Sequence, residues 1–187
     1  MTENILLLQG PVGTFFRRLA KDFRHHGHDV FKVNFNAADR LFYGSENSHD
    51  YRGTARDWPQ WLANFLDEHK ITRIYLFGDS RFYHRLARKV AREKGVDVFV
   101  FECGYIRPDY VTLEPHGVTG NSVIPRDPDF YRSFKATPQR REHVLNHDFG
   151  KAAIWATLYY LAAWFGYWRY PHYQHHRPLN PFSEGSK

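Results

Sequence analysis

Short apolar runs alternate with amphipathic stretches along the first hundred residues of this chain. The runs are dominated by Ile, Leu, Val and Phe, which is typical of strands buried on both faces of a parallel sheet. The stretches between them repeat apolar residues every three or four positions, the period of a helix packed on one side. We expect strands at 5–8, 29–34, 74–77 and 96–101 and helices at 14–26, 58–69 and 81–94. This order predicts an α/β fold with a doubly wound parallel sheet and right-handed crossovers.

The composition fits a soluble chain with an anionic partner. Its 187 residues suffice for one α/β domain, and a hydrophobic share of 42% can supply a core. A net charge of +6 and 12 histidines suit a nucleotide sugar, a phospholipid surface or a nucleic acid. The single cysteine, Cys103, excludes an intrachain disulfide and a cysteine-based zinc site. With no signal-peptide pattern at the N-terminus, we expect the protein in the cytoplasm.

The periodic pattern weakens in three places. Residues 36–54 are polar and predict a long functional loop, and residues 109–146 show no clear period. Residues 152–168 are apolar and rich in Trp and Tyr, but 17 residues are fewer than the roughly 20 that a membrane-spanning helix needs. We expect a helix there that packs in the core, with a helix lying at a membrane interface as the alternative. The predicted division is a Rossmann-like domain at 1–150, followed at 151–187 by an interdomain helix and the start of a second domain.

Two acidic residues follow predicted strands. Glu102 comes directly after the last strand, and Asp79 comes two residues after the third. Ligands of open α/β sheets bind beyond the carboxyl ends of the strands, so both carboxylates are candidates for catalysis. The structural alternative is that Glu102 caps a nearby helix and that Asp79 or Ser80 caps the helix that follows it. The polar residues that continue from Glu102 are Tyr105, Arg107 and Asp109.

Other polar groups lie after the remaining strands. Residues 9–13, which include Gln9 and Gly10, form a turn before a helix, where an anion could bind, although a structural tight turn explains the pattern better. This turn matches neither a dinucleotide fingerprint nor a Walker A loop. Histidines at 172–176 favour a basic aromatic surface over a metal site, and no metal ligands are predicted. The further binding candidates are Asn36, Asp39 and Arg40 after the second strand, and Arg81 and His84 after the third.

These groups, taken in order, resemble the KpsS/LipB family of capsule polysaccharide proteins. The resemblance covers residues 5 to about 179. The motifs that carry it are Leu8-Gln-Gly-Pro-x-Gly-x-Phe-Phe-Arg-Arg-Leu, Asn34-Phe-Asn-x-x-Asp-Arg-x-Phe-Tyr43, Tyr51-Arg-Gly, Trp58-Pro, Phe77-Gly-Asp-x-Arg-x-Tyr-His84, Phe101-Glu-x-Gly-Tyr-x-Arg-Pro-Asp109, Thr112-Leu-Glu114 and Pro125-Arg-Asp-Pro128.

The resemblance implies a β-Kdo glycosyltransferase of capsule assembly in Gram-negative bacteria. Such an enzyme transfers the sugar Kdo from CMP-Kdo to a phosphatidylglycerol-type lipid at the inner face of the cytoplasmic membrane and starts a poly-Kdo linker. It implies the N-terminal, acceptor-side half of a GT-B fold, a retaining mechanism with Glu102 and Asp79 as the acidic groups, and no cofactor. Other capsule assembly or export proteins are expected partners.

Two departures from the family keep an alternative open. Family members are about twice as long as this chain, and Cys103 stands where related transferases carry a second acidic residue. The alternative is a non-catalytic module that binds lipid-linked glycan during capsule assembly or export. A nucleic-acid-binding domain is disfavoured, because the basic residues are not interleaved with aromatic ones in a recognisable RNA-binding motif.

Overall fold

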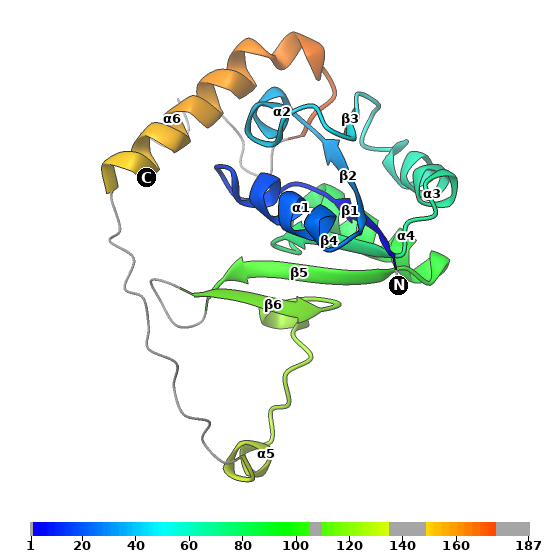
Figure 1. The fold of residues 1–187 in the computed structure, drawn as a ribbon, viewed down its shortest axis with the longest axis vertical. Helices are drawn as coiled ribbons and strands as arrows, with labels where there is room; N and C mark the ends of the chain where they lie inside the picture. The colour runs from blue at the N-terminus through cyan, green and yellow to red at the C-terminus, as the bar shows by residue number, and fades with distance from the viewer. Residues whose placement is uncertain (1, 105–109, 135–148, 175–187) are drawn as a thin grey trace.

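The computed structural model describes residues 2–104, 110–134 and 149–174. Six strands form one sheet of order β3-β2-β1-β4-β5-β6, in which β6 is antiparallel to β5 and every other pairing is parallel. The strands are β1 (Asn4–Leu7), β2 (Asp29–Asn34), β3 (Ser48–Asp50), β4 (Arg73–Phe77), β5 (Asp97–Cys103) and β6 (Val111–Pro115). The helices are α1 (Phe15–His25), α2 (Ala37–Tyr43), α3 (Trp58–Glu68), α4 (Phe82–Lys94), α5 (Pro128–Arg132) and α6 (Phe149–Phe165). The predicted α/β class with a mostly parallel sheet is confirmed (Figure 1).

Helices cover both faces of this sheet. On one face, Phe16 and Ala20 of α1 pack against Ile5, Leu7 and Val30. On the other face, α3 and α4 bury a larger cluster around Trp58, whose side chain is fully enclosed. Fully burying one such large apolar side chain stabilises a fold by about 1.5–3 kcal/mol, so these two clusters fix the helices on the sheet.

The residues at the helix ends show how each helix begins and stops between two strands. Helix α4 ends at Gly95, whose φ of +68° suits glycine and closes the helix in a left-handed cap. Thr14 precedes α1 without donating or accepting a side-chain capping bond. Helix α4 begins after Arg81, so the expectation that Asp79 or Ser80 caps it is wrong. Asp79 is therefore available for other contacts.

The predicted loop at 36–54 is wrong, because it contains α2 and β3. Asn36 accepts a hydrogen bond from the Asp39 amide at 2.8 Å and caps α2, which buries Ala38 and Phe42. Strand β3 is a three-residue edge strand that pairs with β2 from Ser48 to Asp50. Both elements are short, with seven and three residues, so their sequence carries little periodicity, and tertiary contacts decide their structure.

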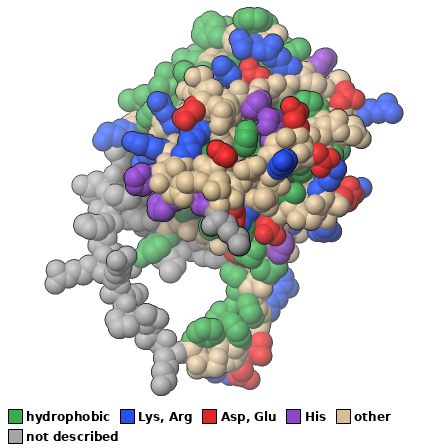
Figure 2. All heavy atoms as spheres, turned by 45° about the vertical axis from the view of Figure 1, so that its right-hand side comes forward, with side chains coloured by type: hydrophobic (Ala, Val, Ile, Leu, Met, Phe, Trp, Pro, Cys, Tyr) green, Lys and Arg blue, Asp and Glu red, His purple; other side chains and the backbone are tan. Residues whose placement is uncertain are grey.

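The stretch after β5 also holds structure that the sequence did not indicate. Within residues 110–134, β6 pairs with β5 so that Glu102 lies opposite Thr112, and α5 follows on a projecting segment (Figure 1). Figure 2 shows hydrophobic side chains on this projection and along the top of the molecule, where α6 lies. The alternating pattern of a half-exposed antiparallel strand is weaker than that of the buried parallel strands.

Helix α6 packs along α2. Gly166, just after it, approaches so closely that an added Cβ would lie 2.1 Å from the Cβ of Ala37. Tyr159 is buried against Ala38 and Phe42, whereas Trp164 and Phe165 are 71% and 68% exposed. The expected helix is confirmed, but the expectation that it packs in the core is wrong, because it contacts α2 along one side and most of its apolar surface is uncovered. In the described part of the chain, no helix combines the length and the apolar character that crossing a membrane requires.

Candidate functional site

The candidate site lies at the carboxyl ends of β1 and β4, where the strand order reverses direction. The chain runs outward from β1 to β2 and β3 on one side, and from β4 to β5 and β6 on the other. Such a switch point is where open α/β sheets bind ligands. Arg81, at the start of α4, donates from Nη1 to the Gly10 carbonyl oxygen at 3.2 Å and so bridges the two strand ends. A guanidinium group is thus held at the switch point.

Three predicted binding residues form one polar network beside this bridge. The Gln9 amide donates to both carboxylate oxygens of Asp39 at 3.2 Å. Asp39 also accepts a bond from the Phe35 amide at 3.1 Å, and Asn36 fixes Asp39 through the cap of α2. All three polar side chains are buried. The predicted grouping of these residues is therefore present in space, but as an enclosed network.

Two tyrosines from the end of the chain close this network. The Tyr159 hydroxyl accepts from Gln9 at 3.3 Å and from Asn36 at 3.0 Å, and the Tyr173 hydroxyl accepts from Gln9 at 3.0 Å. Burial and the nearby Asp39 charge raise the pKa of both phenols, so both keep their protons at neutral pH. Tyr173 also stacks on Tyr83 of α4 at 6.0 Å between ring centres. The segment after α6 thus crosses the edge of the sheet from α2 to α4.

Lys32 lies beneath the network and was not predicted. Its side chain is 2% exposed, and its ammonium group donates to the Val33 carbonyl oxygen at 2.5 Å. Burial lowers the pKa of Lys32 to about 8, although the Asp39 and Asp50 charges act in the opposite direction. Lys32 and Asp39 line a small cavity of about 20 Å³ together with Tyr159, which is room for about one water molecule. The sequence places Lys32 inside the predicted strand at 29–34, and that pattern assigns it no role in a site.

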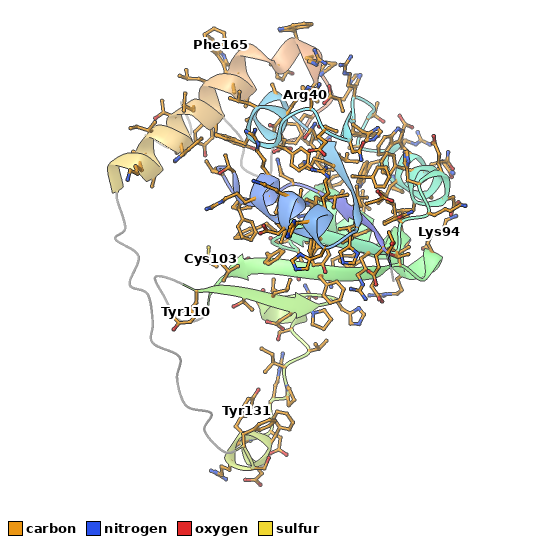
Figure 3. All side chains as sticks on the ribbon, in the orientation of Figure 1. Arg40, Lys94, Cys103, Tyr110, Tyr131 and Phe165 are labelled. Atoms are coloured by element: carbon orange, nitrogen blue, oxygen red, sulfur yellow. The ribbon has the colours of Figure 1, made fainter. Side chains whose placement is uncertain are left out.

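Arg40 does not join this network. It contacts Asp50 of β3, with its Nη1 3.3 Å from a carboxylate oxygen, and Arg169 binds the other oxygen at 3.1 Å. Burial alone would raise the pKa of Asp50, but the nearby Tyr170 hydroxyl, the hydrogen bonds from Asn34 and Arg169 and the Arg40 charge lower it to about 2. This ion-pair cluster ties the segment after α6 to the edge strand, and Figure 3 shows Arg40 on the α2 side of the molecule.

On the other side of the switch point, Asp79 is occupied by structural contacts. Its carboxylate accepts from the Val118 amide at 3.1 Å and from the Asn121 side chain at 2.9 Å, and Arg88 lies 3.5 Å away. The side chain is only 5% exposed. Asp79 therefore fastens the loop after β6 to the start of α4.

Glu102 lies at the same edge of the sheet and remains partly exposed. Its Oε1 accepts from the Cys103 amide at 2.8 Å, and its Oε2 would lie 3.7 Å from a Cβ added to Gly78. Gly78, with φ at +71°, leaves this space free, and the His84 ring donates to its carbonyl oxygen at 2.6 Å. His84 is fully buried, so it shapes the turn from within. Figure 3 marks Cys103 at the same end of β5.

The outcome for the predicted site residues is mixed. Gly10, Arg81 and Glu102 lie at the open part of the edge, while Gln9, Asn36 and Asp39 are enclosed, and Tyr105, Arg107 and Asp109 lie outside the described residues. Tyr159 and Tyr173 were missed, and the only hint was their placement in an otherwise apolar or basic segment. Across residues 2–104, 110–134 and 149–174, no group of three or more His, Cys, Asp or Glu side chains could hold a metal ion.

Comparison with known proteins agrees with the motifs. A family model described as "Capsule polysaccharide biosynthesis protein" matches residues 72–186, more than half of the chain. The chain belongs to this family. Over 97% of its length it is 36% identical to the capsule polysaccharide export protein KpsS of Escherichia coli, covering 47% of that protein. It is 39% identical over 95% of its length to the capsule polysaccharide modification protein LipB of Neisseria meningitidis serogroup B, covering 44% of it.

The chain therefore spans about half the length of the curated relatives it matches. Solved structures with similar folds are more distant. The UDP-GlcNAc 2-epimerase of Methanocaldococcus jannaschii matches 52% of this chain and 30% of its own at 16% identity, with a TM-score of 0.42. The Bordetella bronchiseptica enzyme WbmH matches 51% of this chain and 37% of its own at 12% identity, with a TM-score of 0.40. Membership of the capsule family places the chain in capsule polysaccharide biosynthesis.

Proposed function

We propose that the chain is the acceptor-side half of a retaining β-Kdo transferase, which moves Kdo from CMP-Kdo to a phosphatidylglycerol-type lipid. The observation that carries the proposal is that a partly exposed carboxylate, Glu102, and the Arg81 guanidinium, which binds the Gly10 carbonyl oxygen, lie at the same edge of the sheet. Membership of a capsule biosynthesis family supports the substrate class. The reaction takes place at the cytoplasmic face of the inner membrane, where other capsule assembly proteins act on the product.

In this mechanism Glu102 attacks the anomeric carbon of Kdo. The bond from that carbon to the phosphate oxygen breaks, its electron pair leaves with CMP, and a glycosyl ester of Glu102 forms. A lipid hydroxyl then attacks the same carbon, the ester bond breaks, and the carboxylate is regenerated as the hydroxyl proton leaves to water. Arg81 stabilises negative charge on the departing phosphate. Two inversions at one carbon give net retention.

The test is Glu102→Gln, with Cys103→Ser as the matched control beside it. Transfer of Kdo to a lipid acceptor is measured together with a thermal melt of each protein. We expect at least a hundredfold loss of transfer for Glu102→Gln, of the order seen when a catalytic group is removed, and an unchanged melting temperature. Cys103→Ser should behave as wild type, because this exposed thiol takes no part in the proposed mechanism. Wild-type turnover by Glu102→Gln would remove Glu102 from the mechanism.

A second function is favoured by one observation, the description of a relative: KpsS, to which the chain is 36% identical, is named a capsule polysaccharide export protein. In this second proposal the chain is a non-catalytic module that binds lipid-linked glycan in capsule assembly or export. The same assay separates the two functions. The assay is run on a wild-type protein that also carries the donor-side half. Binding of the lipid-linked glycan by that protein without any transfer supports the binding module and contradicts the enzyme.

A further inference from the structure

A basic pocket lies between α1 and the end of α2. It has a volume of about 800 Å³, within the range of roughly 300–1,000 Å³ that is typical of small-molecule sites. Arg17, Lys21 and Arg24 are spaced four and three positions apart, so they lie on one face of the helix, and Arg18 lines the same pocket. Four cationic side chains thus surround one hollow.

The charge of this pocket is not balanced by the protein. Among its lining residues Glu46 is the one carboxylate, and Arg24 binds it at 2.8 Å. In the described part of the chain, no acidic side chain forms an ion pair with Arg17, Arg18 or Lys21. Like charges four positions apart on a helix repel each other, so this arrangement is unfavourable without an anion.

One wall of the pocket is rigid and holds a hydrogen-bond donor. Arg24 is fixed by the Val30 carbonyl oxygen at 3.0 Å and by the Tyr43 hydroxyl, which accepts from it at 2.9 Å. Because the Tyr43 oxygen acts as acceptor there, its own hydrogen is free to point to a ligand. Burial raises the pKa of Tyr43, so that hydrogen is present at neutral pH. A neutral donor next to several guanidinium groups suits an anion with multiple acceptor oxygens.

We infer that this pocket, lined by Arg17, Arg18, Lys21, Arg24 and Tyr43, is a binding site for a phosphate ester. Guanidinium groups bind the oxygens of a phosphate in pairs, and the exposed Arg17 and Arg18 can reorient around it while Arg24 and Tyr43 stay fixed. The volume exceeds that of inorganic phosphate and accepts the group attached to it. A soluble nucleotide and an anionic lipid headgroup both carry this chemistry. The site is separate from Glu102 and does not depend on the proposed transfer reaction.

The test measures binding of three probes to the 187-residue chain: CMP, inorganic pyrophosphate, and vesicles of phosphatidylglycerol. Cytidine and phosphatidylcholine vesicles serve as uncharged counterparts. We expect at least one phosphate probe to bind while its counterpart does not. The double variant Arg17→Gln, Lys21→Gln should weaken that binding by about tenfold or more, because two charge-assisted contacts are lost. Binding of CMP would assign a soluble ligand, and binding of vesicles alone would assign a lipid headgroup.

The matched control is Arg56→Gln, Lys70→Gln, which removes the same charge from two exposed positions outside the pocket. It should leave the affinity within about twofold of wild type. Equal weakening by both double variants would show nonspecific attraction and overturn the site, as would a failure of all three phosphate probes to bind. The pocket side chains are exposed, so the circular dichroism of the double variant should match wild type. Should it not fold, the single variant Lys21→Gln replaces it, with an expected weakening of about threefold.

Discussion

The two sides of the switch point present their polar residues differently. Towards β2, the Gln9, Asn36 and Asp39 side chains are buried, and the hydroxyls of two tyrosines occupy their amide donors. Towards β5, Asp79 is fastened to a loop, whereas Glu102 accepts from its neighbouring amide and stays partly exposed. A residue's place at the end of a strand therefore does not decide whether it can meet a ligand. The contacts made by distant segments decide it.

The largest expected contrast comes from removing one carboxylate on each side. Asp39→Ala leaves the Gln9 amide and the Phe35 amide without an acceptor and takes away a charge that offsets the buried Lys32. We expect a loss of about 4 kcal/mol in the free energy of unfolding, the range for breaking a buried charged network. Glu102→Ala should cost less than about 0.5 kcal/mol, as is usual for a surface substitution. Urea unfolding of both variants measures these losses in the free energy of unfolding. Similar losses in the two variants would contradict the difference between the buried side and the exposed side.

Asp79→Asn sharpens the comparison within the β5 side. The substitution keeps the shape of the side chain and an oxygen that can accept from the Val118 amide and the Asn121 side chain, but it removes the negative charge 3.5 Å from Arg88. We expect a loss of about 2 kcal/mol in stability, because hydrogen bonds to a charged acceptor become bonds to a neutral one. Activity per folded molecule should remain, in contrast to Glu102→Gln. A strong loss of activity at unchanged stability would instead return Asp79 to the catalytic role that its sequence position predicts.

Much of the fold could be predicted from the sequence, because strands such as Ile5 to Leu8 and helices such as α3 have a clear local pattern of apolar residues. The placement of Glu102 at the end of a strand could be predicted for the same reason. The contacts that close the site could not be predicted from the sequence. Tyr159 and Tyr173 contact Gln9 from 150 and 164 positions away, and no local pattern encodes such pairs. Short elements such as α2 and β3 were missed because seven and three residues show too little periodicity, and tertiary contacts decide their structure.

Lys32 gives the stability of the enclosed side a dependence on pH. Its pKa is about 8 in the folded protein and 10.5 when unfolded, so below pH 8 both states carry the charge and the folded state bears the cost of burying it. As pH rises through 8 the folded state releases its proton first and the cost disappears. Stability should therefore rise by about 2 kcal/mol between pH 7 and 9.5.

The variant Lys32→Met should remove this rise, because no ammonium group is left to lose its proton. Lys70→Met, at an exposed position, is the control and should keep it. Thermal melts across pH 7 to 9.5 make the comparison. An undiminished rise in Lys32→Met would mean that another group titrates and that the lysine is not the source.

The smallest effect tests whether the tyrosine hydroxyls hold the enclosed side shut. Tyr159→Phe keeps the ring packed on Phe42 but removes the oxygen that accepts from Gln9 and Asn36. The Gln9 amide retains Asp39 and Tyr173 as acceptors, so the net loss should be about 1 kcal/mol. Hydrogen exchange of the α2 amides should accelerate by about fivefold, which is that free energy expressed as an opening equilibrium. Tyr167→Phe, at a hydroxyl 63% exposed beyond α6, should change neither quantity. If the α2 amides exchange at the same rate in both variants, ring packing alone holds the network. The side-chain amides of Gln9 and Asn36 are then free to bind a ligand whenever α6 shifts.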